Sequence, residues 1–443
     1  MKTVRSPRLP LLVAMILGHG GVLAGPYSAA LDDPANVNDA PVPGFVGPDG
    51  EGKARLDDGL GGYINARNFV NPLFIRWALG SSNYVRADGQ PAFSDESLAL
   101  GPVTGDNFDV LALGDLSATQ IAGGTPVGKV TLRFTSATQT EPIRNLPGAD
   151  FVVFENGLIA QSGTGGAGVG GIFGELAYVE VSSNNVDFVR FPNVSLTPAS
   201  VGEYGTLDPT NLFNLAGKHA NNDGECWGTP FDLNDLAGHP LVVAGTLDLN
   251  AVRYVRIVDI PGIGSFRDTA TPATHPIYDP WQTIGSGGFD LEAVGAISVA
   301  LSFEKWQDFK GLTGAQRGAL ADPDRDGAPN VAEFVLAMEP LTPDAALLPQ
   351  PARDGASLAI SFRRDTRTAN AIVEVLGTND LLQPWQTLAR SQNGAALAPV
   401  APFATAITDA SESHIASIGV IRRHRVTAPP AMRFLTIRVS LAP

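Results

Sequence analysis

Short runs in which apolar and polar residues alternate recur along the front part of the chain. They are KVTLRF at 129–134, DFVVFE at 150–155, AYVEVS at 177–182, YVRIVDI at 254–260 and FDLEAVGAI at 289–297. Alternation with a period of two sends successive side chains to opposite faces of a strand, so these runs predict β-strands with one buried face. Turn-forming Gly, Asn and Asp residues separate the runs, which favours antiparallel pairing in a β-sandwich.

The pattern changes near residue 300. SFEKWQDFKGL at 302–312 and NVAEFVLAM at 330–338 have the spacing of short amphipathic helices, and an acidic loop lies between them. Strand-like runs then return in SLAISFRR, AIVEVLG and RFLTIRVS. We therefore predict a mainly β protein, with a large jelly-roll-like N-terminal β-sandwich at 25–299, a helical linker at 300–345 and a small C-terminal β-sandwich at 346–443.

The first residues have the layout of a secretory signal peptide. Basic residues precede an apolar stretch at 9–17, and the small-residue sequence Val22-Leu23-Ala24 ends it. This arrangement predicts a signal peptide at 1–24, and hence a secreted or cell-surface protein. The apolar stretch is too short for a permanent anchor, so no membrane span is expected.

Composition and charge narrow the classes of partner. Only 17 % of the residues are charged, while 49 Gly and 34 Pro favour many turns between short strands. A single cysteine excludes an internal disulfide, so another device, such as a metal ion, has to brace an exported fold. Residues 25–300 hold 13 Lys and Arg against 31 Asp and Glu, whereas 301–443 hold 14 of each. An acidic surface repels nucleic acid and attracts hard cations.

The most specific motif is the twelve-residue segment DPDRDGAPNVAE, from Asp322 to Glu333. Acidic or amide residues occupy positions one, three, five, nine and twelve, and a glycine occupies position six, which is the spacing of a Ca²⁺-binding loop. The expected ligands are the side chains of Asp322, Asp324, Asp326, Asn330 and Glu333 and the backbone carbonyl of Ala328. The alternative is an Asp-rich linker that holds no ion.

Position eight of this loop is Pro329, where paired EF-hands carry an aliphatic residue, and no second hand is visible. The segment therefore resembles the lone calcium loops of dockerin-like and thrombospondin type 3-like modules. Regulation would need a coupled pair of helices that opens. We expect instead that Ca²⁺ stiffens the joint between the two sandwiches.

Several strings in the front part resemble an uncharacterised family of exported bacterial cell-surface proteins, some of which end in a PEP-CTERM sorting signal. They include PGADFVVFENG, ELAYVEVSSNNVDFVRFP, GTLDPTNLFNLAGKHAN and GSGGFDLEAVGAI. The resemblance reaches to about Ile297 and implies an exported β domain without an established activity. We expect this chain to differ from the members that end in the C-terminal sorting signal.

Two acids in the last front strand suggest a second ion. Asp290 and Glu292 are two residues apart, so both side chains are expected on one sheet face. Two like charges on one face need solvent or a counter-ion, and Glu155 and Asn156 at the end of DFVVFENG can contribute to a Ca²⁺ site. Solvated acids on a strand face are an equally weighted alternative.

The segment LAGKHANNDGECWGTPFDL is the best candidate for contact with a ligand. Lys218, His219, Asn221 and Trp227 combine hydrogen-bonding groups with a ring that can stack on a sugar, and the neighbouring candidates are Asn222, Asp223, Tyr204 and Trp281. The alternative is a packed loop whose tryptophan lies in the core.

These features favour an exported, non-enzymatic Ca²⁺-binding protein that acts in adhesion or glycan contact, with a polysaccharide or a cell-envelope component as partner. The alternative is a polysaccharide-active enzyme whose acid and base are drawn from Glu175, Glu180, Asp290 and Glu292. A third possibility is a structural envelope component. The sequence does not specify an oligomeric state.

Overall fold

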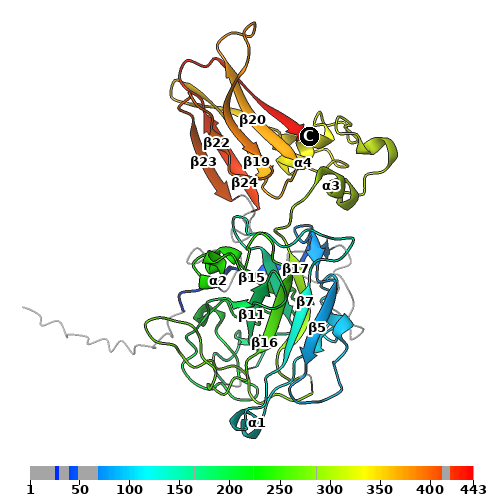
Figure 1. Cartoon of the computed structure of the whole chain (residues 1–443), viewed down its shortest axis with the longest axis vertical. Coiled ribbons are helices and arrows are strands. Elements are labelled where there is room, and N and C mark those ends of the chain that lie inside the picture. Colours follow the sequence, from blue (N-terminus) through cyan, green and yellow to red (C-terminus); the bar gives the residue numbers. More distant parts are fainter. Residues whose placement is uncertain are drawn as a thin grey trace, which may run out of the picture.

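The computed structural model describes residues 25–28, 39–47, 68–162, 165–222, 224–285, 287–411 and 420–442. The predicted signal peptide therefore lies outside the described residues. The protein is mainly β, as predicted, and its sheets are antiparallel. A larger front domain and a smaller tail are stacked along the long axis of the molecule (Figure 1).

Two sheets form the front domain. One has the order β1 (Val42–Pro43), β15 (Trp227–Phe231), β8 (Phe151–Glu155), β17 (Asp290–Ala296) and β4 (Arg76–Trp77), with β6 (Leu111–Ala112) also paired to β17. The other has the order β12 (Val189–Arg190), β11 (Ala177–Ser182), β16 (Tyr254–Asp259), β7 (Lys129–Arg133) and β5 (Gly80–Val85). The five runs predicted from alternation thus became β7, β8, β11, β16 and β17.

Short pairs and helices border these sheets. The pairs are β2 (Phe45–Val46) with β3 (Phe69–Val70), β9 (Leu158–Ile159) with β10 (Ile172–Phe173), and β13 (Val194–Ser195) with β14 (Leu212–Phe213). The helices are α1 (Ala118–Ala122) and α2 (Pro240–Val243).

The front core lies between the two sheets and is rich in valine, leucine and phenylalanine. Phe151 and Phe231 stack with ring centroids 5.4 Å apart, and Phe191 meets both rings edge-on. Every residue of β8 and of β17 is buried. The acids that these two strands carry are therefore held inside the domain.

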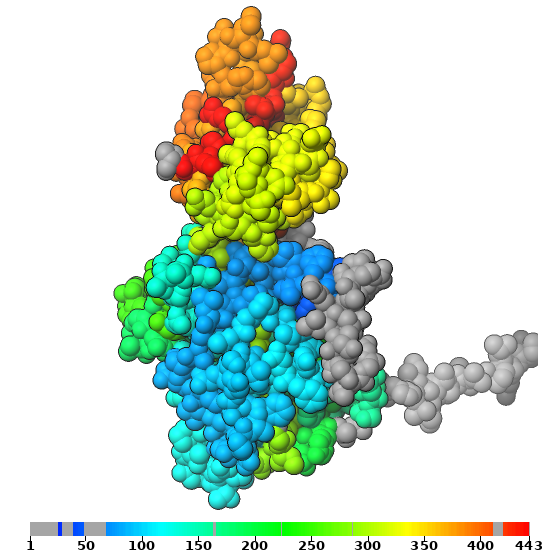
Figure 2. Space-filling view, turned by 90° about the vertical axis from the view of Figure 1, so that its right-hand side faces the viewer, coloured from blue at the N-terminus to red at the C-terminus, as the bar shows by residue number. Residues whose placement is uncertain are grey.

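The linker contains α3 (Phe303–Phe309) and α4 (Asn330–Leu336), close to the two predicted helices. Ser302 caps α3 by accepting a hydrogen bond from the Lys305 amide. Phe303, Trp306 and Phe334 form an aromatic cluster with centroids 5.5–5.7 Å apart, which packs the two helices together. In the space-filling view this yellow-green segment lies between the blue and cyan front domain and the orange and red tail (Figure 2).

Two four-stranded sheets form the tail. Their orders are β18 (Gln350–Asp354), β19 (Ser357–Asp365), β24 (Ile421–Thr427) and β23 (Ala406–Ser411), and β22 (Ala398–Pro399), β21 (Gln386–Gln392), β20 (Ala371–Thr378) and β25 (Phe434–Leu441). α4 packs on β19 and β25, and the aromatic residues of the linker join the tail core.

Polar contacts join the front domain to the linker and the tail. The Arg367 guanidinium, paired with Asp365, donates to the carbonyl oxygens of Leu73 at 3.1 Å and Ile297 at 3.5 Å. Lys305 of α3 forms an ion pair with Glu141 of the front domain. In the part of the chain that the structure covers, no helix has the length and apolar character needed to cross a membrane.

Candidate metal centre

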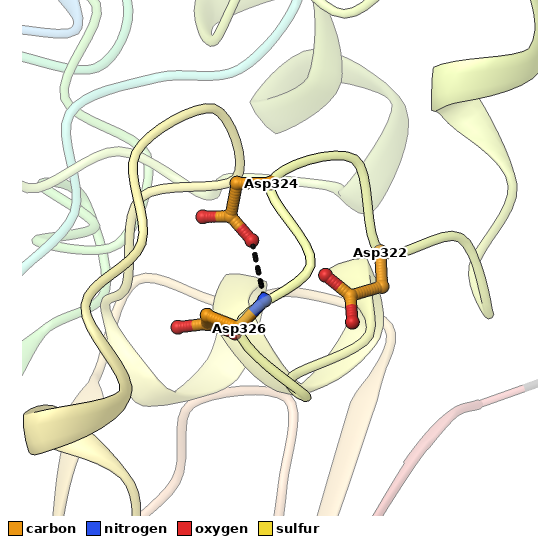
Figure 3. Close-up of side chains that lie close together, drawn as sticks. All are labelled: Asp322, Asp324 and Asp326. Carbon is orange, nitrogen blue, oxygen red and sulfur yellow. Dashed lines mark hydrogen bonds between the residues drawn. The ribbon is translucent and has the colours of Figure 1, made fainter.

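The predicted calcium loop gathers its first three aspartates. One oxygen each from Asp322, Asp324 and Asp326 lies within 4.8 Å of the other two, and Figure 3 shows these side chains on one turn of the loop. The Asp326 amide donates to Asp324 Oδ1 at 3.2 Å. Across the described residues, no other three Asp, Glu, His or Cys side chains meet this spacing. The three carboxylates can therefore hold a metal ion.

Backbone bends explain why the loop closes here. Arg325 and Gly327 have φ values of 65° and 97°, a left-handed conformation that lets the chain curl around its own carboxylates. Asp322 accepts hydrogen bonds from the amides of both residues, at 2.7 and 3.1 Å. Asp326 accepts one from the Ala328 amide at 2.8 Å. The local sequence thus fixes the turn with its own side chains.

Glu333, the predicted last ligand, is fully buried on α4 beside the aspartates. Neither of its carboxyl oxygens has a hydrogen-bond partner. Burial, followed by the charges of neighbouring aspartates led by Asp324 and Asp326, raises the pKa of Glu333 to about 8. A buried carboxyl with two unpartnered oxygens, next to three more carboxylates, has the chemistry of a bidentate cation ligand.

Asn330 and Ala328 lie in the same turn. Asn330 Nδ2 donates to the carbonyl oxygens of Gln316 at 2.5 Å and Gly318 at 2.9 Å, and its buried Oδ1 has no hydrogen-bond partner. Ala328 is buried as well. The side-chain nitrogen of Asn330 thus binds the 316–318 segment, while the side-chain oxygen of Asn330 remains available to an ion.

Asp344 is a neighbour that the motif did not include. Its amide donates to Asp326 Oδ2 at 3.0 Å, its Oδ2 accepts from the Glu339 amide at 3.0 Å, and its Oδ1 is buried without a hydrogen-bond partner. Burial raises the pKa of Asp344, and nearby carboxylates add to the effect. The available sequence signal was Pro343 next to Asp344, a pair that is typical of a turn.

In the front domain, the structure brings Glu155 and Asp290 together, and adds Glu175. Glu155 ends β8, Asp290 begins β17 and Glu175 precedes β11, and all three line one cavity of about 170 Å³. All three are buried. The other polar residues of the lining are Asn156, Asn222, Thr283, Glu203 and Tyr204.

Glu292, expected beside Asp290, has other partners. Its Oε1 accepts hydrogen bonds from the Thr104 amide at 2.6 Å, the Thr104 hydroxyl at 2.9 Å and the Gly105 amide at 2.7 Å, and Oε2 accepts from Asn221. Its strand shifts register against β8 between Leu291 and Ala293, which interrupts the simple alternation. Glu292 is therefore not in the cavity lining, and its oxygens are already engaged.

The predicted ligand-contact loop packs inward. Lys218 is fully buried in an ion pair with Asp39, and His219 Nε2 lies 3.2 Å from the Asp39 carbonyl oxygen. Burial lowers the pKa of His219 well below its usual range. Asn221 is also buried, whereas Trp227 keeps part of its surface. Three of the four predicted contact residues are thus buried, whereas Trp227, which the packed-loop alternative placed in the core, is the one that keeps part of its surface.

Glu180 does not share a site with Glu175. Its Oε1 accepts hydrogen bonds from Arg190 at 2.8 and 3.0 Å, and its Oε2 accepts one from Arg256 at 2.6 Å. Strand register explains the pairs, because Glu180 lies directly across from both arginines on the neighbouring strands. Both carboxyl oxygens of Glu180 are therefore engaged by guanidinium groups, and Glu180 is not among the residues that line the cavity with Glu175.

Tyr204 and Trp281 have different positions. Tyr204 is 61 % exposed at the cavity rim, while Trp281 donates from its indole to the Leu116 carbonyl oxygen at 3.0 Å. Asn222 joins the cavity lining, and Asp223 lies outside the described residues.

Comparison of the chain with protein-family models, with curated proteins and with solved structures finds no match. The resemblance of the front segment to exported cell-surface proteins therefore stays a prediction.

Proposed function

We propose that this is an exported, non-enzymatic Ca²⁺-binding protein that acts at or beyond the cell surface in adhesion or glycan contact. In this proposal, the ion in the 322–333 loop stiffens the linker between the front domain and the tail. The observation that carries it is the group of Asp322, Asp324 and Asp326 oxygens, which lie within 4.8 Å of one another. The buried Glu333 carboxyl, whose two oxygens have no hydrogen-bond partner, is near enough that the charges of these aspartates add to the effect of burial in raising its pKa.

The donor set favours Ca²⁺ over other metals. All the candidate ligands are oxygens, from carboxylates, one amide and one backbone carbonyl, and such hard donors select Ca²⁺ or Mg²⁺ over transition metals. A carboxyl that offers both oxygens suits the larger, flexible coordination shell of Ca²⁺. Extracellular modules of this kind bind Ca²⁺ with a Kd of about 0.1–1 mM.

The position of the loop supports a stiffening role. The loop leads directly into α4, whose Phe334 packs against Phe303 and Trp306 of α3. The hydrogen bond from the Asp344 amide to Asp326 attaches the loop to the segment that enters the tail. An ion that fixes the loop would therefore hold both helices, and through Lys305 the contact with the front domain.

The proposed place of action rests on the sequence. The leader pattern at 1–24 supports export, and the acidic front part argues against nucleic acid as a partner and is compatible with a polysaccharide or an envelope component. Tyr204, exposed at the rim of a polar cavity, supplies a ring on which a sugar can stack.

Calorimetric titration of the full chain with Ca²⁺, and thermal melts with Ca²⁺ and with EDTA, test the proposal. We expect calcium uptake at the loop, and a melting temperature that is higher by about 3 °C when Ca²⁺ exceeds Kd roughly a hundredfold, equivalent to about 2.7 kcal/mol for a chain of 443 residues. Melts that coincide in Ca²⁺ and EDTA, together with no heat of binding, would remove the proposal. A glycan array then tests recognition, and a negative array would favour a purely structural envelope component.

A polysaccharide-active enzyme is the second candidate, because Glu175 and Asp290 lie on one cavity with Glu155. Hydrolysis would need one of these carboxyls as acid and another as base or nucleophile. Assays on a panel of polysaccharides, with Glu175→Gln as the inactive control, test this candidate. Turnover that Glu175→Gln abolishes would replace the non-enzymatic proposal.

A further inference from the structure

We propose that the far end of the tail is a membrane-contact site, which inserts an apolar turn into a lipid surface. The inference rests on the proposed place of action at the cell surface and deepens it, because it names what the tail touches there. It concerns a region of the molecule that is separate from the linker loop and from the cavity of the front domain.

Four large apolar side chains are exposed at this end of the tail, and we term them the tail tip. They are Leu381, Leu382, Trp385 and Phe434, with exposed fractions of 60 %, 91 %, 37 % and 38 %. Single exposed apolar residues are ordinary on a protein surface, whereas a group of them marks a binding surface.

Strand register brings these four residues to one end of a sheet. β20 ends beside Phe434 of β25 on one side, and beside Trp385, which directly precedes β21, on the other. Leu381 and Leu382 belong to the turn that joins β20 to β21. This orange turn lies at the end of the tail farthest from the front domain (Figures 1 and 2). The apolar group is therefore at one extremity of the long molecule.

Hydrogen bonds within the turn fix its shape. The Asp380 carboxylate accepts from the Leu382 amide at 3.0 Å. The Asp380 carbonyl oxygen accepts from the Gln383 amide at 3.0 Å and from the Thr378 hydroxyl at 2.8 Å. Because the turn is ordered before any partner arrives, less conformational freedom is lost when its leucines become buried.

A groove of about 260 Å³ opens beside the tail tip. Trp385 and Phe434 line it, and its other apolar residues come from β18, β19 and β25. Arg433 is the one charged side chain among the described residues that line this groove. Such a lining favours hydrocarbon over water, because the free energy gained follows the apolar area that leaves water.

The loops at this end of the tail carry few charges. Residues 379–385 and 428–433 flank the tail tip, and 400–405 follows β22, which pairs with β21. In these three segments the charged residues are Asp380 and Arg433. Taking a charge out of water is costly, so a charge-poor end of the molecule can approach a hydrocarbon layer at the lowest cost.

The arrangement of side chains favours a lipid surface over a sugar. A sugar site combines an aromatic ring with several hydrogen-bonding side chains, whereas this groove offers Arg433. In an interfacial segment, aliphatic side chains enter the acyl region and aromatic rings stay at the level of the headgroups. Leu381 and Leu382 in the projecting turn, with Trp385 and Phe434 behind them, follow this order. Arg433 can then meet a lipid phosphate.

The distribution of charge along the chain supports the same orientation. Residues 25–300 hold 13 Lys and Arg against 31 Asp and Glu, whereas 301–443 hold 14 of each. Phosphate groups at a membrane surface therefore repel the front domain more strongly than the tail. We expect the tail tip to face the lipid and the front domain to point away from it.

Flotation of the chain with phosphatidylcholine vesicles tests the inference. The leader at 1–24 is removed from every chain compared, because its apolar stretch would itself bind lipid. We expect wild type to float with the vesicles, and a variant that combines Leu381→Ser with Leu382→Ser to bind at least about tenfold more weakly. Leu320→Ser, at a linker leucine that is 84 % exposed, is the matched control and should bind like wild type.

Tryptophan fluorescence locates the contact independently of flotation. Vesicles should shift the emission of wild type to shorter wavelength, because the indole of Trp385 moves from water to the lipid interface. Trp385→Phe keeps an aromatic ring, so it should still float but lose most of the shift. The substituted leucines are exposed, so the double variant is expected to fold, which a melting temperature equal to that of wild type verifies. A shift that Trp385→Phe retains in full would contradict the assignment.

Several results would overturn the inference. They are a wild type that stays unbound, a double variant that floats like wild type, and a Leu320→Ser chain that binds as weakly as the double variant. Without flotation, a dimer that the double variant loses would assign the tail tip to a second copy of the chain, and glycan binding that it loses would assign the tip to a sugar. Calcium uptake is measured on the same chains, so the proposed function stands or falls separately.

Discussion

The linker loop and the front acid cluster both concentrate carboxylates, but the chain builds them in opposite ways. By the front acid cluster we mean the buried residues Asp115, Glu155, Glu175, Asp259, Asp279 and Asp290. Asp322, Asp324 and Asp326 are alternate residues of one turn, partly exposed, and backbone amides of the same turn bind their oxygens. The front acid cluster draws its members from residues 115 to 290 and buries them. A local site depends on its own turn, whereas an assembled site depends on the whole domain.

The difference also has an energetic side. Exposed aspartates keep much of their hydration, so the loop can carry three of them at modest cost. In the front acid cluster, water is replaced by the domain interior, and unpaired charge is expensive there. We therefore expect the loop to gain order from an ion, and charged acids inside the front domain to lower its stability.

The largest expected effect comes from removing a cation that the front domain already has. Lys218→Met leaves Asp39 buried without its ion-pair partner, which should lower the free energy of unfolding by about 3–5 kcal/mol. Urea denaturation measures this loss. Lys305→Met, at the partly exposed pair with Glu141, is the matched control and should cost less than about 1 kcal/mol. Equal losses would mean that burial does not set the cost of an unpaired acid here.

Asp115→Asn should raise the free energy of unfolding in EDTA, whereas Lys218→Met should lower it. Burial raises the pKa of Asp115 to about 7, so between about pH 4 and pH 7 the folded state keeps a proton that the unfolded state releases, and stability falls as pH rises. Asparagine does not titrate and can still accept the Thr283 amide bond. The variant should therefore be more stable than wild type at pH 8, by about 1.4 kcal/mol for each pH unit of that window.

Urea denaturation at pH 4 and pH 8 in EDTA checks this sign, with the exposed rim variant Glu203→Gln as the control. A variant that is less stable than wild type at both pH values would show that the Asp115 charge is not a burden to the fold.

The effect of Glu333→Gln on the melting temperature should differ between EDTA and Ca²⁺. In EDTA it removes a carboxyl that its neighbours repel, so the melting temperature should stay equal or rise. In Ca²⁺ it removes a bidentate ligand, so affinity should fall by at least about tenfold, or about 1.4 kcal/mol. Thermal melts of the variant and of wild type in EDTA and in Ca²⁺ check this difference, and Glu304→Gln serves as the exposed control. A variant that melts below wild type by the same margin in both conditions would point to packing, not to ion binding.

The smallest expected effect is the release of a proton from Glu333 when Ca²⁺ binds the loop. Because the pKa of Glu333 is raised to about 8, the folded protein holds a proton at pH 7 that Ca²⁺ must displace. Loop binding should therefore release about one proton at pH 7 and fewer at pH 9, so apparent affinity should increase with pH up to about 8. Titration calorimetry of the wild-type chain and of Glu333→Gln, in two buffers with different ionisation enthalpies, isolates the proton that Glu333 releases. Heats that do not depend on the buffer at pH 7 would contradict this.

The sequence predicted those strands and that part of the site whose structure depends on residues close together along the chain. Alternation located β7, β8, β11, β16 and β17, because each of these strands has its own apolar pattern. The spacing of 322–333 located the aspartate group, because a twelve-residue turn fixes its own geometry.

The remaining features depend on contacts that spacing does not encode. Glu175 and Asp115 carry no motif, and only the closed sandwich brings Glu175 to the cavity. The partners of Glu180 follow from strand register, which the sequence left open. A polar segment such as that around Lys218 has the same composition whether it faces solvent or, as here, a buried aspartate.

The position of β17 gives the front acid cluster a place in folding. β17 is the last strand of its domain along the chain, yet it lies in the middle of its sheet, between β8 and β4. Asp290 therefore reaches Glu155 only when this late-synthesised strand inserts between partners more than a hundred residues upstream, a slow, non-local step. The front acid cluster can therefore be complete only in a finished sandwich.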